Sequence, residues 1–314
     1  MDFQYNEDQA ALLEGLNAIL KDHSDIPQSA KSGYYFFHEE LQALIERSGF
    51  LDVGREIDAL SAAILTIEAA RVAPLVEVGM SAIIAGALFP ERRLPAPIAY
   101  VSWERIDKPH RNLSIAKTAL IDMGERVALV SVEAAQVEQV QSIYGFPYGR
   151  FLKKPDVSEM LIDGGGSELR RLIRVTIAAE FAGAAQAAIE FTLDYVKERQ
   201  IFGRPIGSFQ AVQHRLAHCW QIAKGLRWLA LKAAWSGGEY DAAMAIAYAQ
   251  ANAQNIIYDL HQFNGAMGMT CEHLLHFWTY RLRALQGELG GAGAAERWAA
   301  DVRWGRAGAA EVRD

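Results

Sequence analysis

The chain has 314 residues, 51% of them hydrophobic and 22% charged, and 38 acidic residues against 31 basic ones give a net charge of −7. This composition excludes a disordered or collagen-like chain, and without a cluster of Lys and Arg the acidic surplus argues against binding to nucleic acid. Two cysteines, Cys219 and Cys271, provide neither a disulfide scaffold nor the ligand set of a zinc site. We expect a globular protein without a metal.

The N-terminal segment carries early acids and lacks the basic region and apolar core of a secretory signal. Apolar stretches are interrupted by charge or glycine before the roughly 18 residues that a membrane helix needs. We therefore expect a cytoplasmic protein with no membrane partner.

The first 90 residues predict an N-terminal helical domain. Leucine and isoleucine recur at helical spacing in three stretches, Pro74 ends the third, and a shorter apolar stretch follows. The expected helices cover residues 5–22, 34–48, 54–72 and about 76–88.

Residues 91–163 predict a small central β domain. Five of the nine prolines lie between residues 91 and 160, and β-branched runs at 97–103 and 126–132 are typical of strands. The sequence Asp-Met-Gly-Glu at 122–125 precedes the second run, as a hairpin turn would.

Residues 164–314 predict a C-terminal four-helix bundle. Ser167 is the candidate N-cap of an alanine-rich helix from Glu168 to about Arg199, whose narrow stripe of small residues lets another helix approach closely. Further helices are expected over residues 209–235, 240–267, 271–286 and about 294–304. The order of elements predicts an α+β fold that is mostly α.

The segment YVKERQIFGRPIGSFQAVQHRLA at residues 195–217 carries the most specific signal. It predicts a helix that ends near Arg199, a loop interrupted by Gly203 and Pro205, and a new helix with Ser208 as its candidate N-cap. An ordinary helix–loop–helix connection could use the same glycine and proline without binding anything.

This segment resembles the C-terminal signature of the acyl-CoA dehydrogenase family. In the family the turn meets the flavin of a neighbouring subunit, so the resemblance implies that Arg199, Phe202 and Gln210 contact FAD. Arginine suits a pyrophosphate, and glutamine can pair with polar edges of the cofactor.

A second stretch, Gln262 to Glu272, resembles the family's Gln-x-x-Gly-Gly-x-Gly-x-Thr motif near the adenosine diphosphate half of the flavin. The matching positions are Gln262, Gly265, Gly268 and Thr270, whereas Ala266 replaces the second glycine. Neither GxGxxG nor GxxxxGK[ST] occurs in the chain, so a nucleotide cofactor would need a site of this other kind.

Two family segments are missing, which implies a truncated central β module. The helical domain lacks the Pro-Glu-x-x-Gly-Gly loop, and the β module lacks the Thr-Glu-Pro-x-x-Gly-Ser-Asp segment. In the family the latter touches the isoalloxazine ring and the thioester end of the substrate.

The catalytic base is displaced as well. Family members abstract the α-proton of an acyl thioester with a glutamate while hydride passes from the β-carbon to the flavin. The usual base position falls on Leu289, with Glu288 one residue early, and the alternative position on the long helix falls on Ile173. Glu288 is the candidate catalytic residue or a solvent-facing acid in a glycine-rich turn, and Glu272 is a weaker candidate.

These features resemble the short subunits of heteromeric acyl-CoA dehydrogenases of steroid and cholesterol side-chain degradation. The resemblance implies an α2β2 assembly with a full-length homologous subunit that supplies the base, FAD as cofactor, an acyl-CoA substrate and an electron-transfer flavoprotein as acceptor. Two alternatives stay open. One is a self-sufficient homotetrameric dehydrogenase with Glu288 as base, and the other is a non-catalytic scaffold without flavin.

Overall fold

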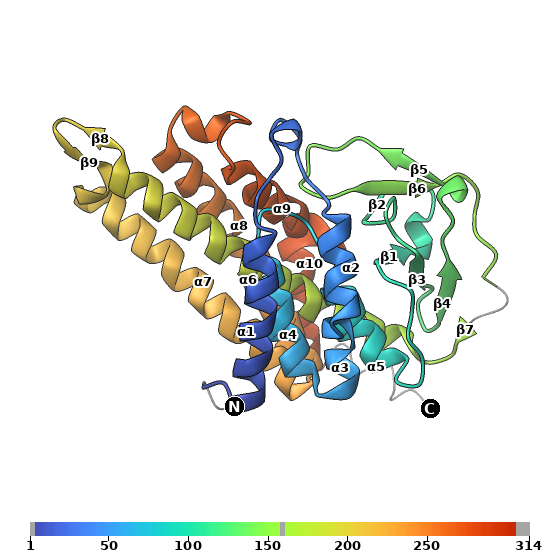
Figure 1. The fold of residues 1–314 in the computed structure, drawn as a ribbon. Helices are drawn as coiled ribbons and strands as arrows, with labels where there is room; N and C mark the ends of the chain where they lie inside the picture. The colour runs from blue at the N-terminus through green and yellow to red at the C-terminus, as the bar shows by residue number, and fades with distance from the viewer. Residues whose placement is uncertain (1–3, 158–160, 306–314) are drawn as a thin grey trace.

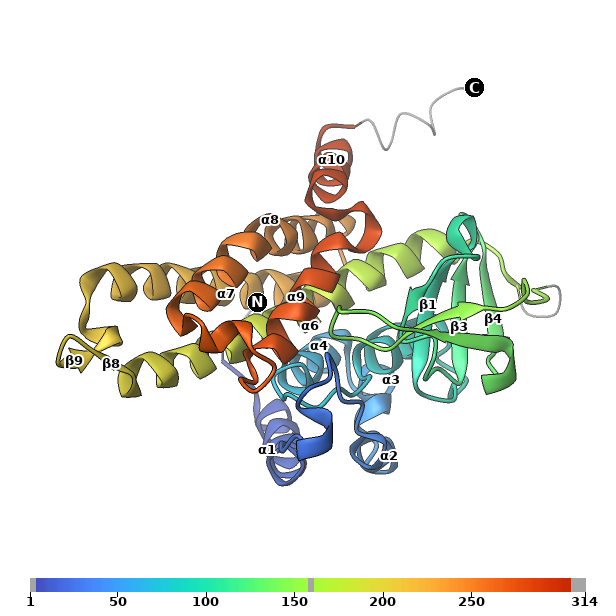
Figure 2. The ribbon, with the colours of Figure 1, turned by 90° about the horizontal axis from the view of Figure 1, so that it is seen from above.

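A computed structural model describes residues 4–157 and 161–305. The N-terminal helices lie beside a bundle of long helices, and the sheets form a module at one end of the molecule (Figure 1). Helix α6 (Gly166–Glu198) runs from this β module to the far end of the bundle (Figure 2).

The N-terminal part contains four α-helices followed by a π-helical turn that continues into a short helix. They are α1 (Glu7–Asp22), α2 (Glu39–Arg47), α3 (Val53–Glu56), α4 (Ala59–Ala69), η3 (Met80–Ala85) and α5 (Gly86–Leu88). Short 3₁₀ turns are η1 (Gln28–Ala30) and η2 (Phe50–Asp52).

The expected helix at 54–72 is wrong in two respects. It is broken before α4 because Asp58 is an N-cap whose carboxylate accepts a hydrogen bond from the Ser61 N–H at 2.6 Å. It also ends at Ala69, five residues before Pro74. The expected helix at 76–88 begins only at η3, where the Glu77 carboxylate accepts from the N–H groups of Met80 and Ser81.

The β module contains two small sheets. One has the order β1 (Ile98–Ser102), β3 (Thr118–Asp122), β4 (Val127–Ser131) and β7 (Leu161–Ile162), with β1 parallel to β3 and the other pairs antiparallel. The other has the antiparallel order β2 (His110–Arg111), β6 (Tyr148–Phe151) and β5 (Val137–Val140). The 3₁₀ turns η4 (Trp103–Arg105) and η5 (Ala134–Gln136) connect strands.

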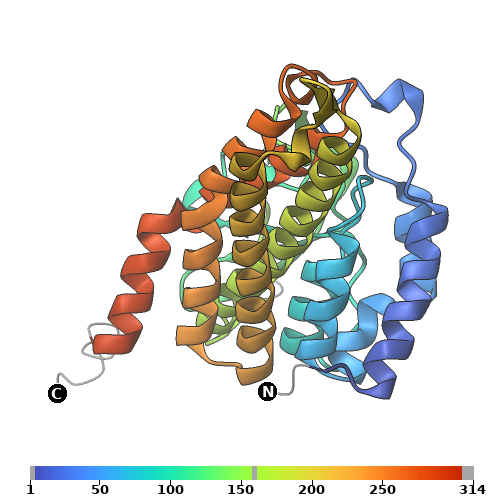
Figure 3. The ribbon, with the colours of Figure 1, turned by 90° about the vertical axis from the view of Figure 1, so that its left-hand side faces the viewer.

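The helices of the C-terminal bundle lie side by side, and the last helix of the chain packs along the bundle's edge (Figure 3). They are α6, α7 (Gln210–Ser236), α8 (Glu239–Asn264), α9 (Leu275–Gly287) and α10 (Gly291–Trp304). Between α6 and α7 lie the hairpin of β8 (Gln200–Ile201) and β9 (Arg204–Pro205) and the turn η6 (Ile206–Ser208). The turns η7 (Met267–Met269) and η8 (Glu288–Gly290) flank α9.

Both predicted serine caps are wrong. Helix α6 starts at Gly166 with Gly165 as N-cap. Only glycine fits at position 166, because a Cβ atom there would lie 1.8 Å from the carbonyl oxygen of Gly124. Helix α7 starts after Phe209, while the Ser208 hydroxyl donates to the Pro205 carbonyl instead.

Helix α6 is the central element of the core. Contrary to expectation, it contains an 18-residue window apolar enough to cross a membrane, but 83% of that window is buried inside the protein. Such burial is typical of the core helix of a globular protein. The predicted fold class, α+β and mostly helical, is confirmed, whereas the domain boundaries after residues 90 and 163 stay predictions.

Candidate functional site

The first group of predicted flavin contacts lies on and beside the β8–β9 hairpin. Arg199 is the exposed C-cap of α6, and its carbonyl oxygen accepts from the Ile206 N–H at 2.8 Å. Phe202 lies at the hairpin tip with φ +54° and is 91% exposed. Gln210 is the exposed first residue of α7. All three side chains therefore belong to the outer surface of this chain.

The second group lies around an open pocket of about 500 Å³ at the end of α8. Gln262 and Gly265 line it, and Gly265 has φ +57° with no atom within 4 Å of the position that a Cβ atom would take. Gly268 and Thr270 follow in and after η7; Gly268 is buried, and the exposed Thr270 donates to the Met267 carbonyl. The pocket is lined by Ile257, Tyr258, His261, Gln262, Gly265, Met269 and Tyr280.

Both groups lie at the same end of the bundle (Figure 3). The Asn264 side chain donates to the Thr192 hydroxyl at 2.9 Å, and the rings of Tyr195 and His273 lie 5.3 Å apart. These contacts fix the turn after α8 against the last turns of α6, which lead directly into the hairpin.

The residues present fit the adenosine diphosphate half of FAD. The pocket has the volume of a small-molecule site, with aromatic walls and the Gln262 amide as a hydrogen-bonding group. Burial lowers the pKa of His261, so its ring is neutral at pH 7. Gly265 leaves its backbone accessible to a ligand, and the Arg199 guanidinium is suited to phosphate oxygens.

Glu288 lies elsewhere, in η8 at the other end of α9. Helix α9 has 13 residues, which corresponds to about 20 Å. The Glu288 side chain is 23% exposed, and its carboxylate lies 3.4 Å from Nε of Arg111. The acid is therefore turned inward and ion-paired.

Glu288 and Ile173, which holds the alternative base position, border the same small cavity. Ile173 and Glu288 both line a space of about 20 Å³, the volume that one water molecule needs, together with Tyr100 and Arg111. Glu272, the weaker candidate, is exposed at the opposite end of α9. Glu288 thus lies beside a cavity that is too small for an acyl thioester.

Sequence reasoning missed a cluster of buried charges next to this cavity. Arg111 donates through Nη1 to the Glu180 carboxylate at 2.6 Å, and the two side chains are 9% and 13% exposed. Burial raises the pKa of Glu180, against the opposing effect of Arg111. The sequence does contain a signal for a buried charge on this helix, since Glu180 is the one charged residue between Val175 and Ile189.

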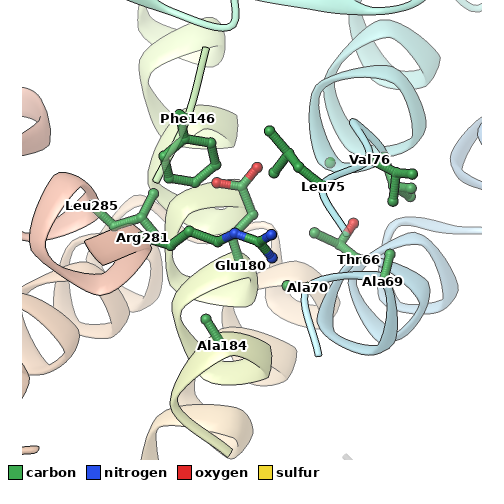
Figure 4. A pocket seen from close by; sticks show the side chains of 12 residues that line it. Thr66, Ala69, Ala70, Leu75, Val76, Phe146, Glu180, Ala184, Arg281 and Leu285 are labelled. Atoms are coloured by element: carbon green, nitrogen blue, oxygen red, sulfur yellow. The ribbon is translucent and has the colours of Figure 1, made fainter. Parts of the chain in front are cut away.

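Arg281 belongs to the same cluster, as Figure 4 shows. Its guanidinium donates to the carbonyl oxygens of Val72, at 2.9 Å, and Ala73. Burial lowers the pKa of Arg281 to about 9, because no close carboxylate bond offsets its desolvation. Among residues 4–157 and 161–305, no group of three or more His, Cys, Asp or Glu side chains could hold a metal ion.

Comparison with known proteins relates the C-terminal part of the chain to one family. Residues 171–302 match the family model "Acyl-CoA dehydrogenase, C-terminal domain". Acyl-CoA dehydrogenase FadE34 of Mycobacterium tuberculosis is 34% identical over 149 residues, which cover 44% of this chain and 20% of that relative. The alignment therefore spans about a fifth of this curated relative.

Two solved structures share the fold over almost the whole chain. The ChsE4-ChsE5 complex from Mycobacterium tuberculosis superposes with a TM-score of 0.77 at 21% identity and covers 100% of both chains. The Tcur3481-Tcur3483 steroid ACAD G363A variant superposes with a TM-score of 0.75 at 21% identity, covering 97% of this chain and 99% of the other. Residues 171–302 thus match the C-terminal domain of the acyl-CoA dehydrogenases, and the predicted resemblance to that family is confirmed.

Proposed function

We propose that this chain is the short subunit of a heteromeric, FAD-dependent acyl-CoA dehydrogenase with an α2β2 arrangement. It contributes Arg199, Phe202, Gln210 and the loop from Gln262 to Thr270 to a flavin held mainly by a full-length homologous partner. The observation that carries the proposal is the outward placement of these side chains: Phe202, at the hairpin tip, is 91% exposed. A residue placed this way can reach a cofactor in a neighbouring subunit.

The reaction proposed for the assembly is α,β-dehydrogenation of an acyl-CoA thioester. FAD, when bound, would accept the hydride from the β-carbon and pass its electrons to an electron-transfer flavoprotein. The residues of this chain bind and orient the cofactor. Arg199 neutralises phosphate charge, and Gln210 and Gln262 offer amide groups to polar edges of the cofactor. The aromatic side chain of Phe202 excludes water where it covers the flavin.

The base is proposed to come from the partner. Glu288 is engaged by Arg111, and the cavity that it lines has room for about one water molecule. Both observations favour the shared site over a homotetramer in which Glu288 abstracts the α-proton. Glu288→Gln in the active assembly separates the two: we expect turnover within about twofold of wild type, whereas the loss of a base costs about 10²-fold or more.

A steroid side-chain thioester is proposed as the acyl group. Support comes from the similarity to the Tcur3481-Tcur3483 steroid ACAD. The purified assembly should therefore turn over a steroid side-chain CoA ester faster than octanoyl-CoA. A preference for octanoyl-CoA would remove this part of the proposal while leaving the shared flavin site in place. The assembly is proposed to be cytoplasmic.

A further inference from the structure

Two small cavities flank the buried pair Arg111–Glu180. The first lies between α4, α6 and α9 and is lined by Glu180 and, among others, Thr66, Gly79, Phe146, Ala184 and Arg281 (Figure 4). The second lies between α6 and the β module and is lined by Arg111 and, among others, Met80, Tyr100, Ile173, Ile177 and Glu288. Each has a volume of about 20 Å³, enough for one water molecule.

One face of α6 borders both cavities. Ile173, Ile177, Glu180 and Ala184 follow at intervals of four, three and four residues, so they lie along the same side of the helix. The adjacent residues Gly79 and Met80 likewise border one cavity each. The two cavities are therefore sections of one slot along α6, the first lined mainly by apolar side chains and the second by both apolar and polar ones, Asn112 among them.

The Arg111–Glu180 pair occupies the middle of this slot. Besides its 2.6 Å bond to Glu180, Arg111 lies 3.4 Å from Glu288 and places its guanidinium 4.7 Å from the centre of the Phe146 ring. Separating such a pair would leave two unpaired charges in the interior. An apolar chain entering the slot would have to displace them, and the burial of a few methylene groups does not compensate for that loss.

We propose that Arg111 and Glu180 exclude acyl chains from the interior of this subunit by dividing the slot into two water-sized cavities. The inference rests on the proposed function in one respect, since the acyl group that reacts in the assembly must then lie in the partner. Arg111 and Glu180 are thus specificity-determining residues rather than catalytic ones.

The experiment measures binding of benzene to the full chain by its thermal shift. An apolar cavity of roughly 150 Å³ stays dry and binds benzene, whereas a water-sized one does not. Arg111→Ala combined with Glu180→Ala removes both charges together and joins the cavities. Saturating benzene should raise the Tm of this double variant by about 3 °C or more. Wild type should shift by less than about 1 °C.

The matched control is Arg111→Met with Glu180→Met, which also removes both charges but keeps the slot filled, and it should not respond to benzene. If the double-alanine variant does not fold, Arg111→Met with Glu180→Ala removes both charges of the pair, keeps the Arg111 side filled and opens the Glu180 side, with the same expectation. A folded, opened variant that fails to bind benzene would overturn the proposal. An equal response in wild type would overturn it too.

Binding of octanoyl-CoA, with free CoA as the control, extends the test to an acyl-CoA ligand. The wild-type chain should bind both compounds equally or bind neither. Tighter binding of octanoyl-CoA to the wild-type chain would contradict acyl exclusion. Because these measurements need neither flavin nor partner, their failure leaves the shared flavin site standing. A chain that stays colourless with every partner would instead remove the proposed function and leave acyl exclusion untouched.

Discussion

Gly183 of α6 packs directly against the backbone of Ile67 in α4. A Cβ atom at position 183 would lie 2.1 Å from the Ile67 carbonyl oxygen and 2.8 Å from Cβ of Ala70. This contact joins the N-terminal helices to the bundle.

Gly183→Ala should destabilise the chain by about 3 kcal/mol, because a backbone oxygen cannot move aside as a flexible side chain can. The control is Gly15→Ala within α1, where the new Cβ would lie at an ordinary 3.5 Å from the Phe50 ring. That change should stabilise by about 0.5–1 kcal/mol, since alanine favours the helix. Urea unfolding of both variants provides the measurement, and equal effects would contradict the packing described.

The His38 cap of α2 should make stability fall as the pH drops below about 6.5. The Leu41 N–H donates to Nδ1 of His38 at 3.2 Å, so the ring caps α2 only while Nδ1 is unprotonated. Burial lowers the pKa of His38, and the nearby His23 lowers it further. A lowered pKa in the folded state means that the contribution is complete above the unfolded value of about 6.5 and is lost as pH falls through the folded value.

His38→Asn isolates this effect, because asparagine is a good N-cap that does not titrate. Urea midpoints measured from pH 7.5 to pH 5 should fall more steeply for wild type than for the variant. A difference between the two that stays constant with pH would show that the His38 ring does not act as a titrating cap.

The two cysteines should differ sharply in reactivity. Cys219 is buried in α7, and burial together with the Asp259 carboxylate raises the pKa of its thiol to about 12. The half-buried Cys271 lies in the turn before α9. Because the thiolate is the reactive form, iodoacetamide at pH 8 should add one label to the native chain, at Cys271, and a second only in urea. Cys271→Ser should abolish labelling of the native chain, and rapid labelling of that variant would contradict the burial of Cys219.

Arg199→Ala should reduce the flavin retained by the proposed assembly about tenfold, the effect expected for losing one charge-assisted hydrogen bond. The matched control is Lys197→Ala, which removes an exposed charge two residues away that pairs with Asp194 at 3.1 Å. Flavin content per protein, measured by absorbance after gel filtration, compares the two. Equal retention in both variants would contradict the proposed contact of Arg199 with the flavin.

Helices with strong apolar periodicity could be predicted from the sequence, because the apolar residues of a buried helix face recur every three or four positions along the chain. Helix α1, expected over residues 5–22, spans Glu7–Asp22. Strand β3 was not predicted, since its residues are buried on both faces and show no alternation. The start of α6 was misplaced because it depends on contact with Gly124, more than 40 residues away in the chain.

The candidate site likewise has a part that the sequence predicts and a part that appears only in the folded chain. The flavin-contact residues Arg199, Phe202 and Gln262 could be selected from the sequence because each belongs to a contiguous motif. The Arg111–Glu180 pair joins positions 69 residues apart, and its partnership exists only in the folded chain. The sequence likewise left open whether Glu288 faces solvent or the interior, which is decided by the turn η8 and by Arg111.

The central claim, that this chain shares its flavin site with a full-length partner, is tested most directly by the visible absorption spectrum and size-exclusion mass of the chain. Both are measured for the chain purified alone and after co-expression with a full-length homologue. The account predicts a colourless lone chain that becomes a yellow heterotetramer only with the partner. A lone chain that forms a yellow homotetramer would contradict it and return Glu288 to the role of base.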